Sequence, residues 1–232
     1  ALDGFAEDSQ TFMPAALLAE NASLIEGYSY DADRANMLLD EAGWVDDDGD
    51  GIREKDGRPL TLELINGFPT CEDNGQTAEV VQAQLAEVGI EVNITCISDY
   101  ATYEQRLADL EGDLFLEIGN QNSASICFLP FILFYGAGED PNYWQIAFGP
   151  TNAGFPEINE ELDNCNASIG NEEAARWGAE AMHTIIDEAR TEIVLAGIYR
   201  IWGTRSCVEN FVPHPVFVFV DWGQTTNAAC ES

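Results

Sequence analysis

Residues 60–119 carry the clearest structural pattern in the chain, and they open with Leu60-Thr61-Leu62-Glu63-Leu64. This strict alternation of apolar and polar residues predicts a strand with one buried face. Two further strand patterns follow at 90–96 and 113–119, and helical spacing of apolar residues fills the intervals between the strands. Strands that alternate with helices favour right-handed crossovers, so we expect an α/β fold with a mostly parallel sheet and helices on both faces.

The flanking sequence predicts the limits of this α/β region. Asp31 and Asp99 can each cap a helix, Gly43 can end the first of these helices, and helical spacing returns over 172–190. The intervening stretch 119–160 is rich in Asn, Gly, Pro and aromatic residues, and we expect an irregular functional loop there. The predicted organisation is an irregular lead-in at 1–30, an α/β lobe at 31–206 and a C-terminal tail segment at 207–232.

The charge of the chain excludes several classes of partner. The sequence holds 42 acidic and 9 basic residues, which gives a formal net charge of -33 at pH 7. Such a field repels nucleic acid and anionic lipid surfaces, so we expect no nucleic-acid partner. The composition fits either an acidic secreted protein or a protein from a high-salt environment, where screening removes the self-repulsion.

The cysteine content indicates an oxidising compartment. The six cysteines lack a C-x-x-C pair and are Cys71, Cys96, Cys127, Cys165, Cys207 and Cys230. An even number at long spacings is typical of disulfides, and the alternative is six buried free thiols. Adjacent parallel strands would bring Cys71 and Cys96 together. Proximity in sequence suggests the other two pairs, Cys127–Cys165 and Cys207–Cys230.

A distinctive segment precedes the sheet. It reads Tyr28-Ser-Tyr-Asp31-Ala-Asp33-Arg-Ala35, then Leu38-Leu39-Asp-Glu-Ala42-Gly43-Trp44, then Asp46-Asp-Asp48-Gly-Asp50-Gly51, and continues to Leu60. A helix that ends in Ala-Gly-Trp and leads into an Asp/Gly-rich turn and a strand resembles the extracellular solute-binding proteins of family 5. The next helix and strand of that family resemble Ala78-Glu-Val-Val-Gln82 and Gly89-Ile90-Glu-Val92.

The resemblance implies the C-terminal lobe of a periplasmic-binding-protein type II-like fold. Family members are substrate-binding components of ABC importers, so it implies a lobe that captures a small solute such as an oligopeptide or oligosaccharide. It also implies a missing N-terminal lobe, a transporter permease as partner, and a periplasmic, secreted or cell-surface lipoprotein location. The alternative is an extracellular structural or adhesive module that retains the fold without transport.

The loop after the third predicted strand supplies a candidate ligand site. In the resembled family this loop often carries an aspartate that pairs with the amino terminus of a bound peptide. Here it reads Asn120-Gln121-Asn122, and Tyr143 and Trp144 follow further along the chain. Amides offer paired donors and acceptors and aromatic rings stack on sugar faces, so these residues favour a neutral polyol. The alternative is a polar turn with two core aromatics.

Alternate carboxylates mark a candidate cation site between the first helix and the first strand. Asp46, Asp48 and Asp50 recur at every second position before a glycine, as in the first half of an EF-hand-type calcium loop. Glu54 and Asp56 are candidates for the remaining oxygen ligands, although a glycine stands at the twelfth position of the pattern. We expect a structural Ca²⁺ that pins the helix to the strand. The alternative is a solvated acidic turn.

The sequence offers no catalytic motif. It lacks a nucleophile elbow, a phosphate-binding loop, a zinc-protease motif and a dinucleotide-binding motif. His183 lies in a helix with an apolar stripe and His214 lies between two prolines, and neither setting is typical of a catalytic base. We therefore expect a binding protein and not an enzyme, with a hydrolase as a third alternative.

Overall fold

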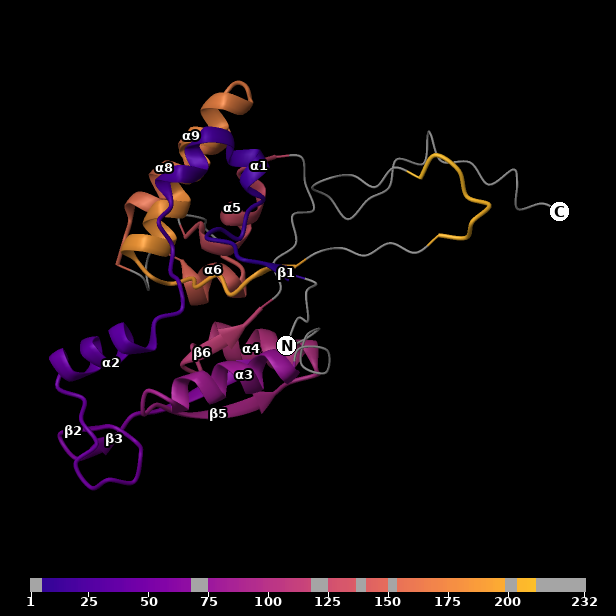
Figure 1. Cartoon of the computed structure of the whole chain (residues 1–232). Coiled ribbons are helices and arrows are strands. Elements are labelled where there is room, and N and C mark those ends of the chain that lie inside the picture. The colour runs from indigo at the N-terminus through magenta and orange to yellow at the C-terminus, as the bar shows by residue number, and fades with distance from the viewer. Residues whose placement is uncertain are drawn as a thin grey trace. The chain divides into compact units, whose positions relative to one another are not determined.

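The computed structural model describes residues 6–67, 75–117, 125–136, 141–149, 154–198 and 204–211. The contacts divide the chain into two compact units, whose elements are labelled in Figure 1. Unit 1 comprises Ala1–Asp3, Ser29–Ile118 and Asn142–Ala147, and unit 2 comprises Gly4–Tyr28, Gly119–Pro141 and Phe148–Ser232. Each unit has a hydrophobic core of its own.

Unit 1 is built on a three-stranded parallel sheet. β4 (Thr61–Asn66) lies in the centre, between β5 (Glu91–Cys96) and β6 (Leu114–Leu116). The three strands predicted from the sequence are therefore confirmed. Their parallel order follows from the helical crossovers that connect them.

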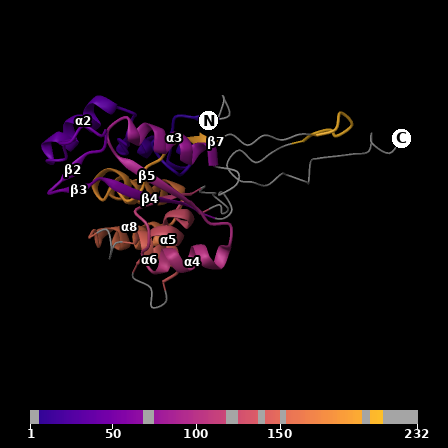
Figure 2. The same cartoon turned by 90° about the horizontal axis from the view of Figure 1, so that it is seen from below.

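Helices cover both faces of this sheet (Figure 2). α3 (Gly75–Ala86) packs through Ala78 on the face that carries Leu64 and Val92. α4 (Tyr100–Ala108) covers the opposite face, where Arg106 Nη2 lies 2.9 Å from Glu63 Oε2. The Thr95 hydroxyl and the Arg106 guanidinium both stabilise the ionised Glu63 carboxyl and lower its pKa.

Two helices of unit 1 begin at the predicted aspartate caps. Asp31 precedes α2 (Ala32–Glu41) and accepts a hydrogen bond from the Arg34 amide at 2.8 Å. Asp99 precedes α4 and accepts one from the Thr102 amide, also at 2.8 Å. Each cap satisfies an amide that the first helical turn leaves without an intrahelical partner.

Unit 2 is mainly helical in the part of the chain that the structure describes. Its elements are α1 (Ala15–Leu18), the 3₁₀ segment η1 (Ala19–Leu24), α5 (Phe128–Phe134), α8 (Glu157–Ala167), α9 (Asn171–His183) and the π-helical segment η2 (Thr184–Glu188). A short antiparallel pair joins β1 (Ala6–Glu7) to β7 (Gly197–Ile198). α8 and α9 pack against one another, and both contribute residues to the core of the unit (Figure 1).

The structure of unit 2 differs from two expectations. The lead-in at 1–30 was expected to be irregular, but α1 and η1 form within it because Met13 and Leu18 enter the core at 1% and 0% exposure. The stretch 119–160 was also expected to be irregular, but it contains α5. Pro130 is the third residue of α5, where the helix needs no amide donor, so it does not prevent the helix.

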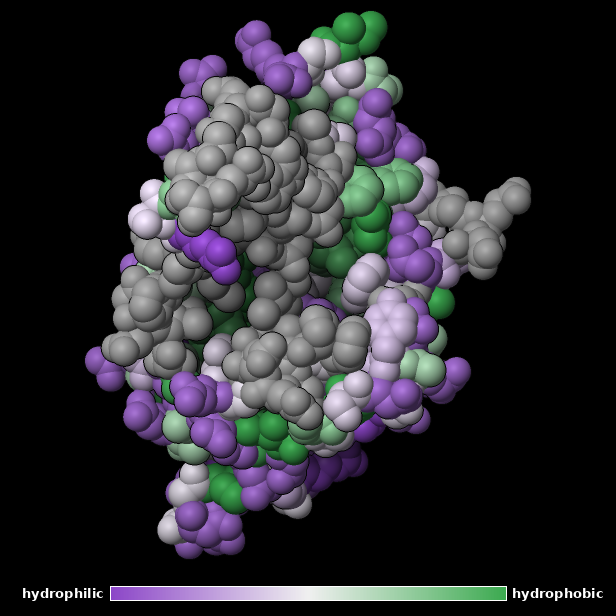
Figure 3. Space-filling model, turned by 90° about the vertical axis from the view of Figure 1, so that its right-hand side faces the viewer, coloured by the Kyte–Doolittle hydropathy of each residue, from purple (hydrophilic) through white to green (hydrophobic). Residues whose placement is uncertain are grey.

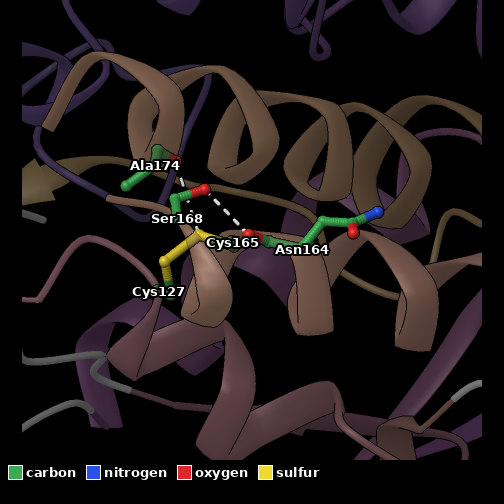
Figure 4. Close-up of a disulfide and its surroundings, with 5 residues drawn as sticks. All are labelled: Cys127, Asn164, Cys165, Ser168 and Ala174. Atoms are coloured by element: carbon green, nitrogen blue, oxygen red, sulfur yellow. Dashed lines mark hydrogen bonds between the residues drawn. A yellow bond between two sulfur atoms is a disulfide. The ribbon is translucent and has the colours of Figure 1, made fainter. Parts of the chain in front are cut away.

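One predicted disulfide lies inside the core of unit 2 (Figure 4). Cys127, next to the first residue of α5, is joined to Cys165 of α8 with a Cα–Cα distance of 5.8 Å, which confirms that pairing. Cys96 and Cys207 are disulfide-bonded as well. The pairings of these two with Cys71 and Cys230 stay predictions, because Cys71 and Cys230 lie outside the described residues.

The described surface on one side of the molecule is largely hydrophilic, with smaller apolar areas between the polar side chains (Figure 3). This distribution accords with the excess of acidic residues in the sequence. Among the described helices, none combines the length and the apolar character that a bilayer crossing requires.

Candidate functional site

The carboxyl ends of the three parallel strands lie at one edge of the sheet in unit 1. The last residue of β4, Asn66, pairs with Cys96 of β5 and with Leu116 of β6, so the three strands end at the same level. In open α/β sheets, ligands bind outside the carboxyl ends of the strands. We name this region, defined by Asn66, Cys96, Leu116 and the residues that directly follow them, the strand-end edge.

The described residues bring polar groups to the strand-end edge that the sequence interpretation missed. Asn66 is only 1% exposed although it ends an apolar strand, and Glu117 follows β6 directly as a half-buried carboxyl group. Gly67 follows β4, and the Tyr103 ring packs so closely on it that any Cβ there would overlap the ring. The signal in the sequence was a polar or glycine residue at the end of each apolar strand.

The predicted ligand residues are placed only in part. Asn120, Gln121 and Asn122 follow β6 in the sequence but lie outside the described residues. Tyr143 and Trp144 begin α6 (Tyr143–Phe148), which belongs to the same compact unit as the sheet. Trp144 is half-buried.

A capping box fixes the start of α6. The Asn142 side-chain oxygen accepts a hydrogen bond from the Gln145 amide at 3.0 Å, and the Gln145 side chain accepts one from the Asn142 amide at 3.0 Å. Such reciprocal bonds satisfy two amides at a helix start. These bonds fix where α6 begins, and they therefore place Trp144 in its first turn.

The structure brings four of the five predicted cation ligands together. Carboxylate oxygens of Asp46, Asp48, Asp50 and Glu54 all lie within 4.8 Å of one another. The three aspartates are exposed and Glu54 is half-buried. We name these four residues the carboxylate turn. Four oxygens of this kind at this separation match the donor set that a hard divalent cation such as Ca²⁺ takes.

The aspartate side chains also stabilise the turn by accepting hydrogen bonds from its backbone amides. Asp46 accepts hydrogen bonds from the amides of Gly49 and Gly51, at 2.7 and 3.0 Å. Asp48 accepts one from the Asp50 amide at 3.1 Å. These bonds hold the alternate side chains on one side of the loop, and the positive φ angles of 80° and 93° at the two glycines permit the bend.

Asp56, the fifth predicted ligand, has a different role. It stands between β2 (Glu54–Lys55) and β3 (Arg58–Pro59), which form an antiparallel hairpin. Asp56 and Gly57 have φ angles of 53° and 72°, the pattern of a two-residue hairpin turn that favours Asp-Gly. Asp56 is therefore a turn residue and not a member of the carboxylate turn.

Arg53 joins the carboxylate turn to the rest of unit 1. Its Nε donates to the Val88 carbonyl at 2.8 Å, and its Nη1 donates to Asp40 Oδ1 at 2.6 Å and to the Trp44 carbonyl at 2.7 Å. Its Nη2 donates to Asn36 Oδ1 at 2.8 Å. The side chain is 13% exposed, so one largely buried guanidinium links α2 to the turn that precedes β5.

Comparison with known proteins identifies the family. The model of the middle part of the bacterial extracellular solute-binding proteins, family 5, matches residues 1–138, which is more than half of the chain. The chain therefore belongs to this family of solute-binding proteins. Oligopeptide-binding protein AppA of Bacillus subtilis is 41% identical over 80 residues, which cover 34% of this chain and 14% of that protein. The nickel-binding periplasmic protein of Escherichia coli is 33% identical over 86 residues, 37% of this chain and 16% of that protein.

Solved structures share the fold. NikA from Brucella suis, in complex with Fe(III)-EDTA, has a TM-score of 0.61 at 25% identity over 85% of this chain. A mannohexaose-bound periplasmic oligopeptide-binding protein from Thermotoga maritima has a TM-score of 0.60 at 22% identity over 81% of this chain. The expected periplasmic-binding-protein type II fold, with α and β elements around a parallel sheet, is thus confirmed. This chain spans 36–38% of those two solved chains, well under half of their length.

Proposed function

We propose that this chain is the C-terminal part of the substrate-binding component of an ABC importer. The observation that carries the proposal is the strand-end edge of unit 1, in a chain that belongs to a family of solute-binding proteins. A second lobe, which the longer relatives have room for, would complete the cleft over this edge. A transporter permease then receives the solute outside the cytoplasmic membrane. In this role the chain binds its solute and carries out no reaction on it.

The chemistry of the region favours a neutral, hydroxyl-rich solute. The sequence that follows β6 contains three amide residues, Asn120, Gln121 and Asn122, and Trp144 lies in the same unit as the sheet. Amides and an aromatic face together suit an oligosaccharide. Glu117 supplies one carboxylate at the strand-end edge, so an oligopeptide with a free amino terminus is the second solute class that a test must include.

Isothermal titration calorimetry of the complete gene product against manno-oligosaccharides, oligopeptides and nickel complexes tests this function. We expect saturable binding of one solute class, with manno-oligosaccharides preferred to oligopeptides.

We also expect Trp144→Ala to weaken binding at least about fivefold, because a central aromatic contact contributes more than about 1 kcal/mol. The matched control is Trp177→Ala in unit 2, where Arg176 stacks on the indole at 4.1 Å; it should leave the affinity unchanged. Absence of binding to every solute class would favour a structural or adhesive module instead.

We further propose that the carboxylate turn holds a structural Ca²⁺. The close approach of four carboxylates supports this, because such charges repel one another unless a cation neutralises them. The site would join α2 to the hairpin β2–β3 by stabilising the loop between them. Its ligands are all oxygens, which suits calcium and does not suit zinc.

Calcium is therefore expected to raise the thermal midpoint of unfolding. At a free concentration of about 100 times the dissociation constant, binding stabilises by about 2.7 kcal/mol, or roughly 5–10 °C for a chain of this size. In EDTA, Asp48→Asn should raise the midpoint slightly, because asparagine can still accept the hydrogen bond from the Asp50 amide but carries no charge. In calcium, the same variant should show no increase in the midpoint, because one charged ligand is lost. Asp47→Asn, outside the cluster of four, is the control. Differential scanning calorimetry that shows equal midpoints in calcium and EDTA would contradict the site.

A further inference from the structure

A half-buried carboxyl group lies between two helices of unit 2, away from the strand-end edge. Glu161 of α8 has its Oε1 2.9 Å from the Thr184 hydroxyl, at the point where α9 passes into η2. Thr184 is 4% exposed, and its hydroxyl also lies 3.2 Å from the Glu180 carbonyl one turn earlier. The second oxygen of Glu161 is buried and has no hydrogen-bond partner among the described residues.

The surroundings of Glu161 favour its neutral form. Burial is the largest cause, and Glu180, Glu157 and Glu188 add negative charge, so the pKa of Glu161 rises to about 7 even though the Thr184 hydroxyl lowers it.

Of the other titratable groups on or beside these elements, His183 and Asp163 have partners elsewhere, and Glu192 is a second carboxyl group whose pKa burial raises to about 7. His183 Nδ1 lies 2.8 Å from Asp187 Oδ2, and His183 Nε2 lies 3.5 Å from Glu188 Oε1. Asp163 of α8 is hydrogen-bonded to the Tyr135 hydroxyl, and α5, which also packs on α8, carries no ionisable side chain. No cationic side chain is therefore paired with Glu161 in the described part of the chain.

The hydroxyl of Thr184 has one proton and cannot donate to two acceptors at once. When Glu161 is neutral, its O–H can donate to Thr184 Oγ1, and Thr184 can donate to the Glu180 carbonyl, so both contacts are satisfied. When Glu161 is ionised, Thr184 must donate to the carboxylate, and the Glu180 carbonyl loses this donor. The ionised state also leaves one buried carboxylate oxygen without a donor, which costs more than an unpaired neutral oxygen.

The residues that follow Thr184 hold the chain segment leading into unit 1. In η2, Asp187 accepts hydrogen bonds from the amides of Glu26 and Gly27, at 2.9 and 2.7 Å. Tyr28, the last residue of that segment of unit 2, donates its hydroxyl to the Ile186 carbonyl at 3.2 Å. Short π-helical segments of this kind occur frequently at functional sites.

We propose that Glu161 and Thr184 form a protonation-dependent latch on η2: the neutral carboxyl keeps η2 ordered and segment 26–28 attached to it, and ionisation loosens that attachment. The latch makes the connection into unit 1 firmer in mildly acidic surroundings than in alkaline ones. Its chemistry needs no ligand and is independent of the proposed solute and calcium sites.

The direction of the pH dependence follows from the raised pKa. Because the folded state holds the proton of Glu161 up to about pH 7 and the unfolded chain releases it near 4.5, the folded state binds more protons between these values. The contribution of Glu161 to stability is therefore fully present below about pH 4.5 and is lost as the pH rises through 7.

A titration of the Glu161 carboxyl carbon by ¹³C NMR on the full chain tests whether this group is protonated up to neutral pH, with an expected midpoint near 7. Hydrogen exchange of the Gly27 amide tests whether ionisation loosens segment 26–28 from η2. At pH 8 we expect at least about tenfold higher protection in Glu161→Gln than in the unsubstituted protein, and equal protection at pH 5, because the glutamine amide mimics the neutral acid. Glu160→Gln on the exposed side of α8 removes the same charge and should leave the pH course of Gly27 protection unchanged.

Two results overturn the latch. The first is a Glu161 midpoint near 4.5; the second is Gly27 protection that follows the same pH course in Glu161→Gln as in the unsubstituted protein. Thr184→Val offers an independent check if Glu161→Gln unfolds. Without the hydroxyl, the ionised carboxylate loses its donor, so the pH at which Gly27 protection falls should move upward, and an unchanged midpoint also overturns the latch.

Discussion

Replacing Arg53 with methionine is expected to lower the free energy of unfolding of unit 1 by about 3–5 kcal/mol. Methionine fills a similar volume but donates no hydrogen bond. The carbonyls of Val88 and Trp44 and the side-chain oxygen of Asn36 would then lose their donor in a region where the Arg53 side chain is only 13% exposed. Urea denaturation, followed by amide hydrogen exchange in β4 and β5, measures the loss within unit 1.

Two companion variants separate the geometry of the guanidinium from its charge. Arg53→Lys keeps the charge but cannot reach the same set of acceptors, so it should recover less than half of the lost stability. Arg58→Met removes one positive charge from an exposed position on β3 and should change the stability by less than about 0.5 kcal/mol. Equal stability of Arg53→Met and Arg58→Met would contradict the linking role of Arg53.

Removing the disulfide of unit 2 by the double substitution Cys127→Ser and Cys165→Ser is expected to cost about 4 kcal/mol. The bond closes a loop with a sequence separation of 38, and the chain-entropy model assigns a stabilisation of this size to such a loop. Both cysteines are 2% exposed, so the serine hydroxyls would also enter an apolar core. Thermal unfolding monitored by circular dichroism measures the change.

The control for the double variant is the unsubstituted protein, measured with and without a reducing agent. Reduction should lower its midpoint, whereas the double variant should respond only through the remaining disulfides. A double variant that unfolds within about 1 kcal/mol of the unsubstituted protein would show that the core of unit 2 does not depend on this bond.

Much of unit 1 was predictable because its signals are local. Alternating residues gave β4 and β5, and the side chains of Asp31 and Asp99 marked the starts of α2 and α4. Gly89, shortly after the end of α3, has φ at +83°, a conformation that favours glycine. A second reason for this glycine is tertiary, because the Arg53 side chain lies against it and leaves no room for a Cβ.

Unit 2 was harder to predict because its elements are fixed by distant contacts. α1 is only four residues long and forms where Leu18 enters a core that α9 completes. The apolar pattern over 172–190 indicated a single helix, but the structure changes to π-helical geometry at Thr184. The network that links Asp187 to Glu26 and Gly27 spans about 160 residues and has no signature in local spacing.

The candidate sites also differ in whether local sequence or distant contacts determine them. The carboxylate turn was predictable from alternate aspartates, and the exception, Asp56, belongs to a hairpin turn that depends on its pairing across β2 and β3. At the strand-end edge the predicted amides Asn120–Asn122 follow β6 in the sequence, but Asn66 and Glu117 were missed. Their importance depends on the register of three strands, which becomes visible only when the sheet is assembled.

In the proposed function, a solute binds at the strand-end edge of unit 1. An NMR titration of the complete gene product with the solute that gives calorimetric binding tests this most directly. We expect the amide resonances of Gly67, Ile97 and Glu117 to shift with the affinity found by calorimetry, while those of α8 and α9 stay in place. Saturable binding that leaves these three amides unchanged and shifts resonances elsewhere would contradict it.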